Sequence, residues 1–350
     1  MHRCLQLAQL GEGSVAPNPM VGAVLVYNDR IIGEGYHRQY GQAHAEVNCV
    51  NSVTEADKAL IPEATIYVSL EPCAHFGKTP PCADLIIEKG IKNVVVGCRD
   101  PFSEVDGKGI EKLKAAGIKV TTGILEKECL ASNKRFFTFH TQHRPFIVLK
   151  WAQTADGQIA NEDYSRLLIS NAYTNRLVHQ WRSQQMAILV GTNTALFDDP
   201  SLTTRLWPGK DPIRLVVDMN LRLPTSLKLF DGATPTIVFN KQKHTLEQLK
   251  NIEWLSAGLQ FYQVTEDVSL VHQIINALYQ LNIQSVLVEG GTQLLQSFID
   301  EGMWDEAKVI TNEELVLGKG LPAPALKGHH FIDSFSLQAD HILTYKNLQH

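Results

Sequence analysis

The sequence predicts an α/β protein of two domains. Runs of apolar and β-branched residues alternate with segments whose apolar residues recur every three or four positions, and this alternation continues from end to end. No internal repeat, low-complexity tract or charge run interrupts it. The chain has 350 residues, more than one average domain of roughly 100 to 200 residues, and its 44% hydrophobic content is enough for two buried cores. We therefore expect domains over residues 1–144 and 145–350.

The predicted elements of the first domain follow one another closely. Apolar runs predict strands, and segments of helical periodicity that stop at glycines predict helices. The strands are expected over residues 20–27, 64–70, 93–98 and 118–122, and the helices over 43–53, 83–89 and 109–116. The aromatic and basic segment 133–140 could stack bases in a nucleic-acid-binding protein. We favour a helix between the domains that packs its phenylalanines.

Three residues of this domain have the types that hold a catalytic zinc ion. His44 opens a predicted helix, Cys73 follows a buried strand, and Cys82 opens the next helix. Catalytic zinc takes three protein ligands and leaves a position for water, whose pKa falls to roughly 7. Glu46 is badly placed to be a ligand but can carry protons to a leaving amino group, so the pattern predicts a hydrolytic deaminase. Cys49 lies about 140° round the helix from His44 and is expected in the core.

A substrate loop is expected between the two cysteines. Residues 74–81 form a longer gap than the two residues of deaminases that act on polynucleotides, although a solvated loop without function would look similar. His75, Lys78 and Thr79 offer donors for a phosphate or an exocyclic group. Asn18, held between prolines at the start of a strand, and His37 are further candidates.

The ordered motifs resemble the deaminase half of the bacterial bifunctional riboflavin-biosynthesis deaminase/reductase family. They are Pro17-Asn18-Pro19 with Val21-Gly22, Gly33-Glu34-Gly35-x-His37, His44-Ala45-Glu46, Glu71-Pro72-Cys73-x-His75 and Gly77-Lys78-Thr79-Pro80-Pro81-Cys82. In that family the zinc ligands match His44, Cys73 and Cys82, and the proton carrier matches Glu46. The substrate contacts match Asn18, His37, His75, Lys78 and Thr79. The resemblance implies a three-layer fold like that of cytidine deaminase.

The second domain has no Gly-x-Gly-x-x-Gly fingerprint but offers another ligand-binding turn. An apolar strand over 285–289 runs into Gly290-Gly291 and a helix over 293–300, and such glycines let backbone N–H groups approach a pyrophosphate. A tight turn alone would also use two glycines. A strand begins at Phe146, and polar clusters over 150–157 and 191–205 follow apolar strands, where α/β proteins usually bind ligands.

These clusters resemble the reductase half of the same family, which has a fold like dihydrofolate reductase and takes hydride from NADPH. The resemblance implies an NADPH site at Ala152, Thr194, Asp198, Glu289, Gly290, Gly291, Thr292, Gln293, Leu294 and Leu295. It implies substrate contacts at Lys150, Arg182, Leu202 and Arg205. Where many members have a serine that contacts substrate, this chain has Tyr164-Ser165-Arg166, and we expect Arg166 to replace that serine as a phosphate partner. Asp156 is assigned to an Asp-Gly turn.

The net charge and the cysteines limit which partners and which cellular compartment we expect. A net charge of −5 argues against a general nucleic-acid or membrane surface, and no apolar run approaches the roughly 20 residues of a membrane span. The amino terminus does not resemble a secretion signal, so we expect a cytoplasmic protein with free thiols at Cys4, Cys49, Cys98 and Cys129. The expected partners are a small phosphorylated pyrimidine and further copies of the chain.

We therefore predict a bifunctional enzyme with Zn²⁺ and NADPH as cofactors. It deaminates a diaminopyrimidine ribosyl phosphate by hydrolysis and then reduces the ribosyl group to a ribityl chain. One alternative is a single-activity cytidine or guanine-type deaminase with a degenerate second domain. Another is a zinc-stabilised binding module, for example one that binds RNA. A purely structural zinc site would have four ligands and would not need Glu46.

Overall fold

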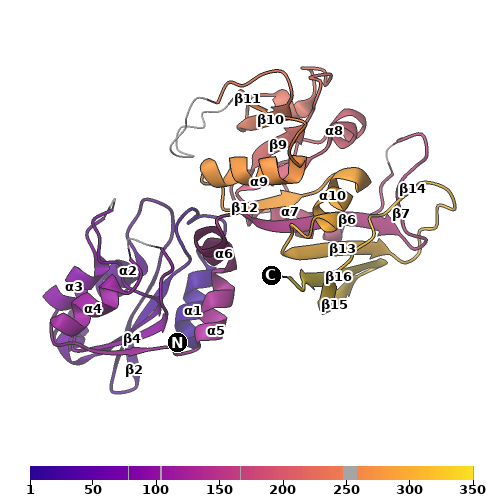
Figure 1. The fold of residues 1–350 in the computed structure, drawn as a ribbon. Helices are drawn as coiled ribbons and strands as arrows, with labels where there is room; N and C mark the ends of the chain where they lie inside the picture. The colour runs from indigo at the N-terminus through magenta and orange to yellow at the C-terminus, as the bar shows by residue number, and fades with distance from the viewer. Residues whose placement is uncertain (78, 103–104, 166, 247–257, 350) are drawn as a thin grey trace. The chain divides into compact units, whose positions relative to one another are not determined.

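The computed structural model describes residues 1–350 except 78, 103–104, 166, 247–257 and 350, so the predicted site residues Lys78 and Arg166 lie outside the described residues. The chain divides into two compact units, Met1–His143 and Arg144–His350 (Figure 1). Each unit is built on a sheet that carries helices, so the predicted α/β class is confirmed. Among the described residues, no helix is both long enough and apolar enough to cross a bilayer.

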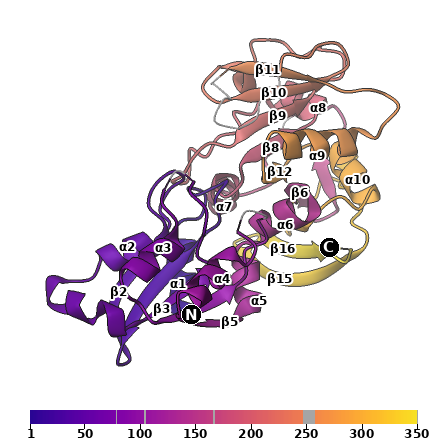
Figure 2. The same ribbon diagram turned by 60° about the vertical axis from the view of Figure 1, so that its left-hand side comes forward.

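A five-stranded sheet forms the centre of the first unit. Its strands are β1 Gly22–Tyr27, β2 Arg30–Tyr36, β3 Thr65–Leu70, β4 Asn93–Cys98 and β5 Lys119–Thr122. They are ordered β2-β1-β3-β4-β5, with β1 antiparallel to both neighbours and β3, β4 and β5 parallel (Figure 2). Because parallel strands end at the same edge of a sheet, the segments that follow β3 and β4 meet there.

Helices cover both faces of this sheet. They are α1 His2–Gln9, α2 Ala45–Asn51, η1 Glu55–Glu63, α3 Cys82–Glu88, α4 Lys108–Ala115, α5 Glu126–Ser132 and α6 Lys134–Gln142. Successive residues of β1 face opposite layers, so Leu25 packs in the cluster that holds Cys49 of α2, while Val24 packs with Leu7 of α1. The predicted three-layer arrangement is confirmed. His44 precedes α2 because its backbone is extended (φ −71°, ψ 168°), which makes it the N-cap rather than a helical residue.

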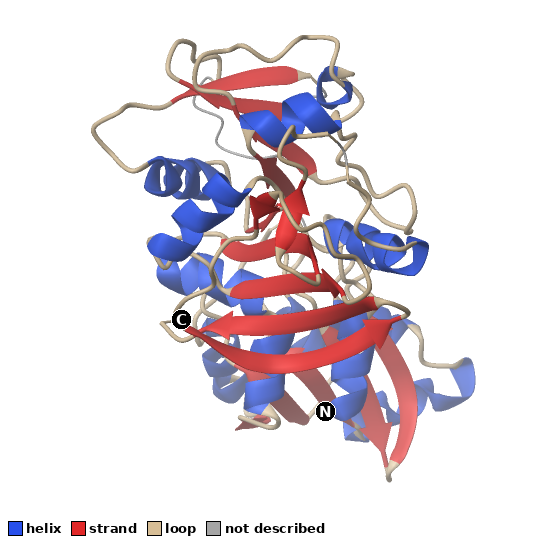
Figure 3. Cartoon of the chain, turned by 90° about the vertical axis from the view of Figure 1, so that its right-hand side faces the viewer, coloured by secondary structure: helices blue, strands red, loops and turns tan. Residues whose placement is uncertain are grey.

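The second unit contains a larger, mostly parallel sheet. Its strands are β6 Phe146–Thr154, β8 Ala187–Val190, β9 Ile213–Val217, β10 Thr236–Asn240, β11 Leu259–Gln263, β12 Ser285–Val288, β13 Glu306–Asn312, β15 His329–Leu337 and β16 Asp340–Asn347. They are ordered β11-β10-β9-β8-β12-β6-β13-β16-β15, and all are parallel as far as β13 (Figure 3). The last pair, β16 and β15, is antiparallel. Two short strands, β7 Gln158–Ala160 and β14 Leu321–Pro322, form a separate ribbon.

Among the described residues of this unit, four α-helices cover the two faces of the sheet. They are α7 Ala172–Ser183, α8 Thr192–Asp198, α9 Leu270–Gln280 and α10 Thr292–Asp300, and a short 3₁₀ helix, η2, covers Lys228–Phe230. Ile274 of α9 and Phe298 of α10 pack in the main core with Leu149 of β6. On the opposite face, Trp181 of α7 packs with Val148, and the next strand residue along β6 therefore faces the other layer.

A buried ion pair fixes the start of β6 to the segment that enters β13. Arg144 donates to both carboxylate oxygens of Asp305, at 2.8 and 2.7 Å, and Ile147 N–H donates to the same carboxylate at 2.7 Å. Both charged side chains are only 6% exposed. Loss of either partner would leave a desolvated charge without compensation.

Asp305→Ala should therefore lower the free energy of unfolding of the second unit by about 3 to 5 kcal/mol. Urea denaturation followed by circular dichroism measures the loss. The matched control is Asp300→Ala, which removes the exposed pair with Lys327 (3.1 Å) and should cost less than about 1 kcal/mol. Equal effects of the two substitutions would contradict the importance of the buried pair.

Candidate active sites

His44, Cys73 and Cys82 come together at one end of the first sheet. The His44 Nδ1 atom lies 3.6 Å from Cys73 Sγ and 3.4 Å from Cys82 Sγ, and the three ligand atoms all lie within 4.8 Å of one another. Tetrahedral zinc with ordinary Zn–N and Zn–S bonds would separate nitrogen from sulfur by about 3.6 Å. The residues thus fit a zinc ion in both donor type and spacing.

Local structure prepares the two thiols for metal binding. Cys73 follows the carboxyl end of β3, and Cys82 is the first residue of α3, where its backbone N–H donates to Cys73 Sγ at 3.3 Å. The hydrogen bond from the Cys82 thiol, assisted by His44, lowers the pKa of Cys73 to about 4. The pKa of Cys82 is raised in turn because it holds the proton that the pair shares. Cys73 is therefore ready to bind metal as a thiolate.

Glu46 lies in the first turn of α2, two residues after His44, and is buried. It is not one of the three clustered metal-binding residues. Burial, and after it the negative charge of Cys73, raises the pKa of the Glu46 carboxyl. A carboxyl group with a raised pKa exchanges protons more readily near neutral pH, as the predicted proton carrier must. Cys49, by contrast, is a fully buried member of the core.

The Glu71 carboxylate supports the metal site, and sequence reasoning missed its role. It accepts hydrogen bonds from the backbone N–H groups of Asp100 (3.3 Å), Gly107 (3.0 Å), Gly109 (3.0 Å) and Ile110 (3.2 Å). The start of α4 is thereby fastened to the chain just before Cys73. Gly109 is required by this contact, since a Cβ atom there would lie 1.9 Å from the Pro72 carbonyl oxygen. The signal was the glutamate of the Glu71-Pro72-Cys73 motif, which follows a buried strand directly and so needs hydrogen-bond donors.

Asn18 and His37 lie together beside the metal-binding histidine. Asn18 Nδ2 is 3.1 Å from His37 Nε2, and His37 Nδ1 is 3.1 Å from the Ala43 carbonyl oxygen. Because that carbonyl can only accept, Nδ1 carries the proton and Nε2 accepts from the Asn18 amide. Burial lowers the pKa of His37, which keeps it neutral. Its ring meets that of His44 edge to face at 5.3 Å, so both predicted substrate residues lie beside the metal-binding cluster.

Asn133 anchors the segment that carries Asn18, and sequence reasoning missed it. Its side-chain oxygen accepts from Met20 N–H at 2.7 Å, and its amide nitrogen donates to the Met20 carbonyl at 2.8 Å. Asn133 is buried at the junction of α5 and α6. This paired hydrogen bond holds the entry to β1, which no periodic pattern in the sequence indicates.

Thr79 and His75, from the loop between Cys73 and Cys82, lie in two different surroundings. Thr79 Oγ1 lies 3.4 Å from His44 Nε2, next to the metal-binding cluster. The His75 ring instead lies 6.1 Å from the ring of Phe102, which in turn is 5.1 Å from the ring of His140. Thr79 therefore lies beside the metal-binding cluster, whereas His75 belongs to an aromatic group with Phe102 and His140.

In the second unit, the predicted clusters meet at the carboxyl ends of three adjacent strands, β8, β12 and β6. The register pairs Val288 with Leu149 on one side and with Leu189 on the other. The next residues along the strands, Glu289 and Lys150, are therefore neighbours. This is the sheet edge at which parallel α/β folds bind ligands.

Glu289 links the basic residues predicted to face substrate. Its carboxylate accepts from Arg182 Nε at 2.8 Å and Nη2 at 2.7 Å, and it lies 3.8 Å from Lys150 Nζ. Burial alone would raise the pKa of Glu289, but the two cations outweigh burial and lower it to about 2. The family resemblance implied a place for Glu289 in the NADPH site, whereas its side chain is bonded to residues assigned to the substrate.

The glycine turn packs closely against the end of β8. A Cβ atom on Gly290 would lie 3.0 Å from the Cα and Cβ atoms of Val190. Gly291 has φ +57° and caps α10, whose first-turn N–H groups have no intrahelical acceptor. Such a helix start fits a pyrophosphate. The side chain of the predicted NADPH residue Leu295 is buried in the core, and its N–H donates to the Gly291 carbonyl at 3.1 Å.

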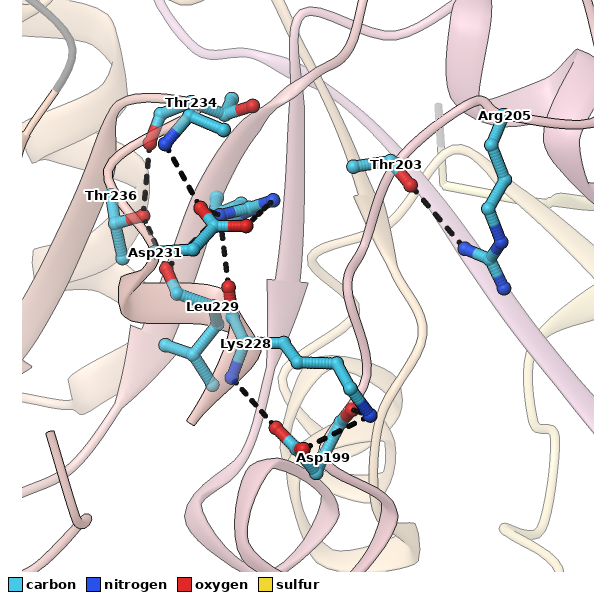
Figure 4. A network of polar contacts seen from close by, with 10 residues as sticks. Asp199, Thr203, Arg205, Lys228, Leu229, Asp231, Thr234 and Thr236 are labelled. Atoms are coloured by element: carbon cyan, nitrogen blue, oxygen red, sulfur yellow. Dashed lines mark hydrogen bonds and ion pairs between the residues drawn. The ribbon is translucent and has the colours of Figure 1, made fainter. Parts of the chain in front are cut away.

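The remaining predicted reductase residues divide between strand ends and loops. Thr194 lies beside the glycine turn, because its Oγ1 would be 3.5 Å from a Cβ atom on Gly291. The next residues along the chain begin α10: Thr292 is half-buried, Gln293 is exposed and Leu294 is buried. Ala152 lies near the end of β6, and Asp198 is the last residue of α8. Leu202 is buried, and Arg205 is exposed and donates to Thr203 Oγ1 at 3.3 Å (Figure 4). Asp156 accepts from Gly318 N–H at 2.7 Å and from Thr154, in line with a turn.

Comparisons with known proteins cover both units. The family model of the cytidine and deoxycytidylate deaminase zinc-binding region matches residues 1–98, and that of the RibD C-terminal domain matches residues 145–347. The riboflavin biosynthesis protein RibD of Aquifex aeolicus is 42% identical over 92% of this chain and 88% of its own length. The chain belongs to the RibD family.

Other RibD proteins extend this finding. RibD of Escherichia coli is 33% identical over 90% of this chain and 87% of its own length. A crystal structure of the Thermotoga maritima diaminohydroxyphosphoribosylaminopyrimidine deaminase/5-amino-6-(5-phosphoribosylamino)uracil reductase superposes with a TM-score of 0.87, at 35% identity, over 99% of this chain and 97% of that one. Acinetobacter baumannii RibD gives 0.86 at 31% identity over the same shares.

The RibD family membership confirms the main functional prediction. The chain is a bifunctional enzyme of riboflavin biosynthesis, with a zinc-binding deaminase domain and an NADPH-dependent reductase domain. The cytidine-deaminase-like fold of the first unit and the reductase fold of the second are confirmed as well. The alternative of a single deaminase activity with a degenerate second domain is not supported, because the reductase family model spans nearly all of the second unit.

Cys82→Ser should remove zinc and abolish deamination, because zinc prefers a thiolate to a hydroxyl group. Cys49→Ser is the matched control and should retain zinc, since Cys49 lies in the core outside the ligand cluster. Metal analysis of the purified proteins by mass spectrometry decides between them. Zinc retained in the Cys82 protein, or lost from a folded Cys49 protein, would reverse this choice of ligands.

Glu46→Gln should keep the zinc ion and the fold, because it preserves the shape of the buried side chain, but should slow ammonia release by roughly 10² to 10⁴. Glu34→Gln is the control, since Glu34 pairs with Arg3 near the surface at 2.7 Å and should not affect ammonia release. Both are assayed for ammonia and for bound zinc. Near-normal release from the zinc-loaded Glu46 variant would exclude it as the proton carrier.

Proposed function

We propose that the first unit hydrolyses the exocyclic amino group of a diaminohydroxypyrimidine carrying a phosphoribosylamino group. The second unit would then reduce the ribosyl group of the resulting aminouracil to a ribityl chain. The observation that carries this proposal is the His44, Cys73 and Cys82 cluster with the buried Glu46 beside it. The Thermotoga maritima structure, whose name states these two activities, supports the same order of reactions.

We assign the deaminase residues as follows. Zinc held by His44, Cys73 and Cys82 would supply a Lewis acid that lowers the pKa of a water molecule to about 7. Glu46 takes a proton from the attacking water and delivers it to the amino group that leaves as ammonia. Asn18, oriented by His37, hydrogen-bonds the pyrimidine ring. Thr79 closes the site beside His44, while His75 and Lys78 contact the distal part of the substrate.

In the reductase unit, different groups bind the cofactor and the substrate. Bound NADPH supplies the hydride. The N–H groups of the first turn of α10 bind its pyrophosphate, and Thr194, Ala152 and Asp198 contact other parts of the cofactor. Arg182 and Lys150, held in place by Glu289, face the sugar, and Arg205 and Arg166 bind its phosphate. The pairing with Glu289 keeps two cations close together without an uncompensated buried charge.

We also propose that each activity belongs to one of the domains 1–144 and 145–350, and that the enzyme is a cytoplasmic homo-oligomer. The cysteines form no disulfide, which agrees with a reducing compartment. The outer strand β15 exposes Phe331 and Phe335 at the edge of the second sheet. An exposed apolar edge strand is suited to contact with a second copy, and sedimentation velocity tests this.

Gln293→Glu should separate the two activities. A carboxylate in the first turn of α10 favours the helix by about 0.3 to 1 kcal/mol but repels a pyrophosphate at the same place. We expect the Kd for NADPH to rise about tenfold or more, unchanged ammonia release, and accumulation of the deaminated, unreduced compound. Substitution of Gly290 would be less informative, because even a Cβ atom would press on Val190.

The matched control is Gln293→Ala, which removes the side chain without adding charge and should raise the Kd for NADPH less than the Glu variant does. Ammonia release and NADPH oxidation are measured on the same preparation. An unchanged Kd in the Glu variant would mean that the glycine turn has only a structural role. Loss of both activities in a folded protein would contradict the assignment of one activity to each unit.

A further inference from the structure

Two exposed aromatic residues of the reductase unit are stacked on each other. The ring centroids of Tyr164 and Phe197 lie 4.8 Å apart, with 12° between the ring planes. Tyr164 belongs to the segment that follows β7, whereas Phe197 is on α8. The two residues are 37% and 47% exposed, so the contact lies at the surface and not in the core. Neither residue has a role in the mechanism proposed above.

On one side, the stack is connected to the glycine turn through α8. A Cβ atom on Gly291 would lie 3.5 Å from Thr194 Oγ1, and one on Gly191, just before α8, would lie 3.8 Å from Leu294 Cβ. The start of α8 therefore packs against the start of α10. Phe197 comes three residues after Thr194, so it lies on the same face of α8, one turn further along.

On the other side, the stack is connected to the glycine turn through the β7–β14 ribbon. Thr292, the first residue of α10, donates from Oγ1 to the Pro322 carbonyl at 2.7 Å. Pro322 belongs to β14, which pairs with β7, and β7 ends at Ala160, four residues before Tyr164. Because β12 lies between β8 and β6 in the sheet, α8 and this ribbon follow the two neighbours of the strand that carries the glycine turn.

The segment 161–165 forms a turn that holds Tyr164 in an unfavourable backbone conformation. Tyr164 has φ +62°, in the left-handed region that residues with a Cβ atom rarely adopt. Its N–H donates to the Asn161 carbonyl at 3.1 Å, and the Asn161 amide donates to Ser165 Oγ at 2.9 Å. Ser165 N–H donates to Asp163 Oδ1 at 2.9 Å. Residues held in such conformations are concentrated at active sites and ligand clamps.

These contacts form a closed circuit. It runs from the glycine turn through Thr194 and α8 to Phe197, and then through Tyr164 and the β7–β14 ribbon back to Thr292. The start of α10 forms one side of the circuit, and the stacked rings form the other. Two exposed rings are held together more weakly than paired strands, so the stack is the part of the circuit that can open.

We propose that Tyr164 and Phe197 are further NADPH-binding residues, whose stacked rings form an aromatic strap across the bound cofactor. The dinucleotide lies between the strap and the start of α10, so the rings must separate before it enters or leaves. The strap therefore slows the release of NADPH. This inference rests on the proposed NADPH site at the glycine turn.

Stopped-flow measurement of NADPH release from the full-length enzyme tests the strap. Tyr164→Ala and Phe197→Ala each remove one ring. We expect either to raise koff for NADPH about tenfold, or about 1.4 kcal/mol, which is the strength of an aromatic pair. The double variant should release NADPH no faster than the single variants, because the two rings act as one unit. Tyr164→Phe retains the stack and should restore the parent koff.

The matched control is Leu196→Ala. Leu196 is exposed on α8 next to Phe197, but it comes two residues after Thr194 and so lies off the face that meets the glycine turn. Its koff should equal that of the parent, and circular dichroism confirms that each variant is folded. A parent-like koff in both ring-deleted variants would overturn the proposal. Additive effects in the double variant would overturn the strap as well, because each ring would then contact NADPH independently.

Hydrogen–deuterium exchange of residues 291–294 supplies a readout that needs no cofactor. These N–H groups have no intrahelical acceptor, so they exchange slowly only where other parts of the chain cover them. In NADPH-free enzyme they should exchange faster in the two alanine variants than in the parent and in Tyr164→Phe. If the parent does not bind NADPH, or if Gln293→Glu leaves its Kd unchanged, the proposed cofactor site fails, and the exchange rates alone decide whether the strap covers the start of α10. Unchanged exchange would overturn it.

Discussion

A buried carboxylate that must find hydrogen-bond donors organises each of the two sites. Glu71 directly follows β3, and Glu289 directly follows β12, so both lie at the carboxyl end of a central parallel strand. Desolvating an unpaired carboxylate costs several kcal/mol. Each carboxylate is therefore stable in the interior only where segments distant in the chain supply donors or cations. Glu71 accepts hydrogen bonds from backbone N–H groups at the start of α4, and Glu289 pairs with Arg182 and Lys150. The functional turns, Pro72-Cys73 and Gly290-Gly291, come immediately after these anchors.

The zinc centre could be predicted from the sequence because its chemistry allows few residue types. Three ligands and one acid in a fixed order are enough to identify a zinc site, and the apolar pattern of the preceding strands shows where each ligand lies in the fold. The supports of the site could not be predicted in the same way. Asn133 acts through hydrogen bonds to backbone atoms far away in the chain, and backbone partners leave no mark on the sequence.

The reductase cofactor run shows a second limit of sequence reasoning. Residues 289–295 read as one continuous NADPH segment, but the chain passes from strand to turn to helix within them. Each change of backbone geometry redirects the side chains. Glu289 consequently faces α7, Gly291 adopts a conformation suited to glycine, and Leu295 is buried in the core. Side chains of one continuous segment thus lie in three different environments.

The paired hydrogen bond between Asn133 and Met20 also bears on how the first unit is completed during synthesis. The zinc-binding region matched by the family model ends at residue 98, after all three ligands have been made. The anchor for the segment before β1 that carries Asn18 is made later, when the ribosome reaches the junction of α5 and α6. A chain that ended at residue 98 would hold all three metal ligands but neither this anchor nor the backbone N–H groups that bind the Glu71 carboxylate, so the deaminase unit depends on residues beyond the matched region.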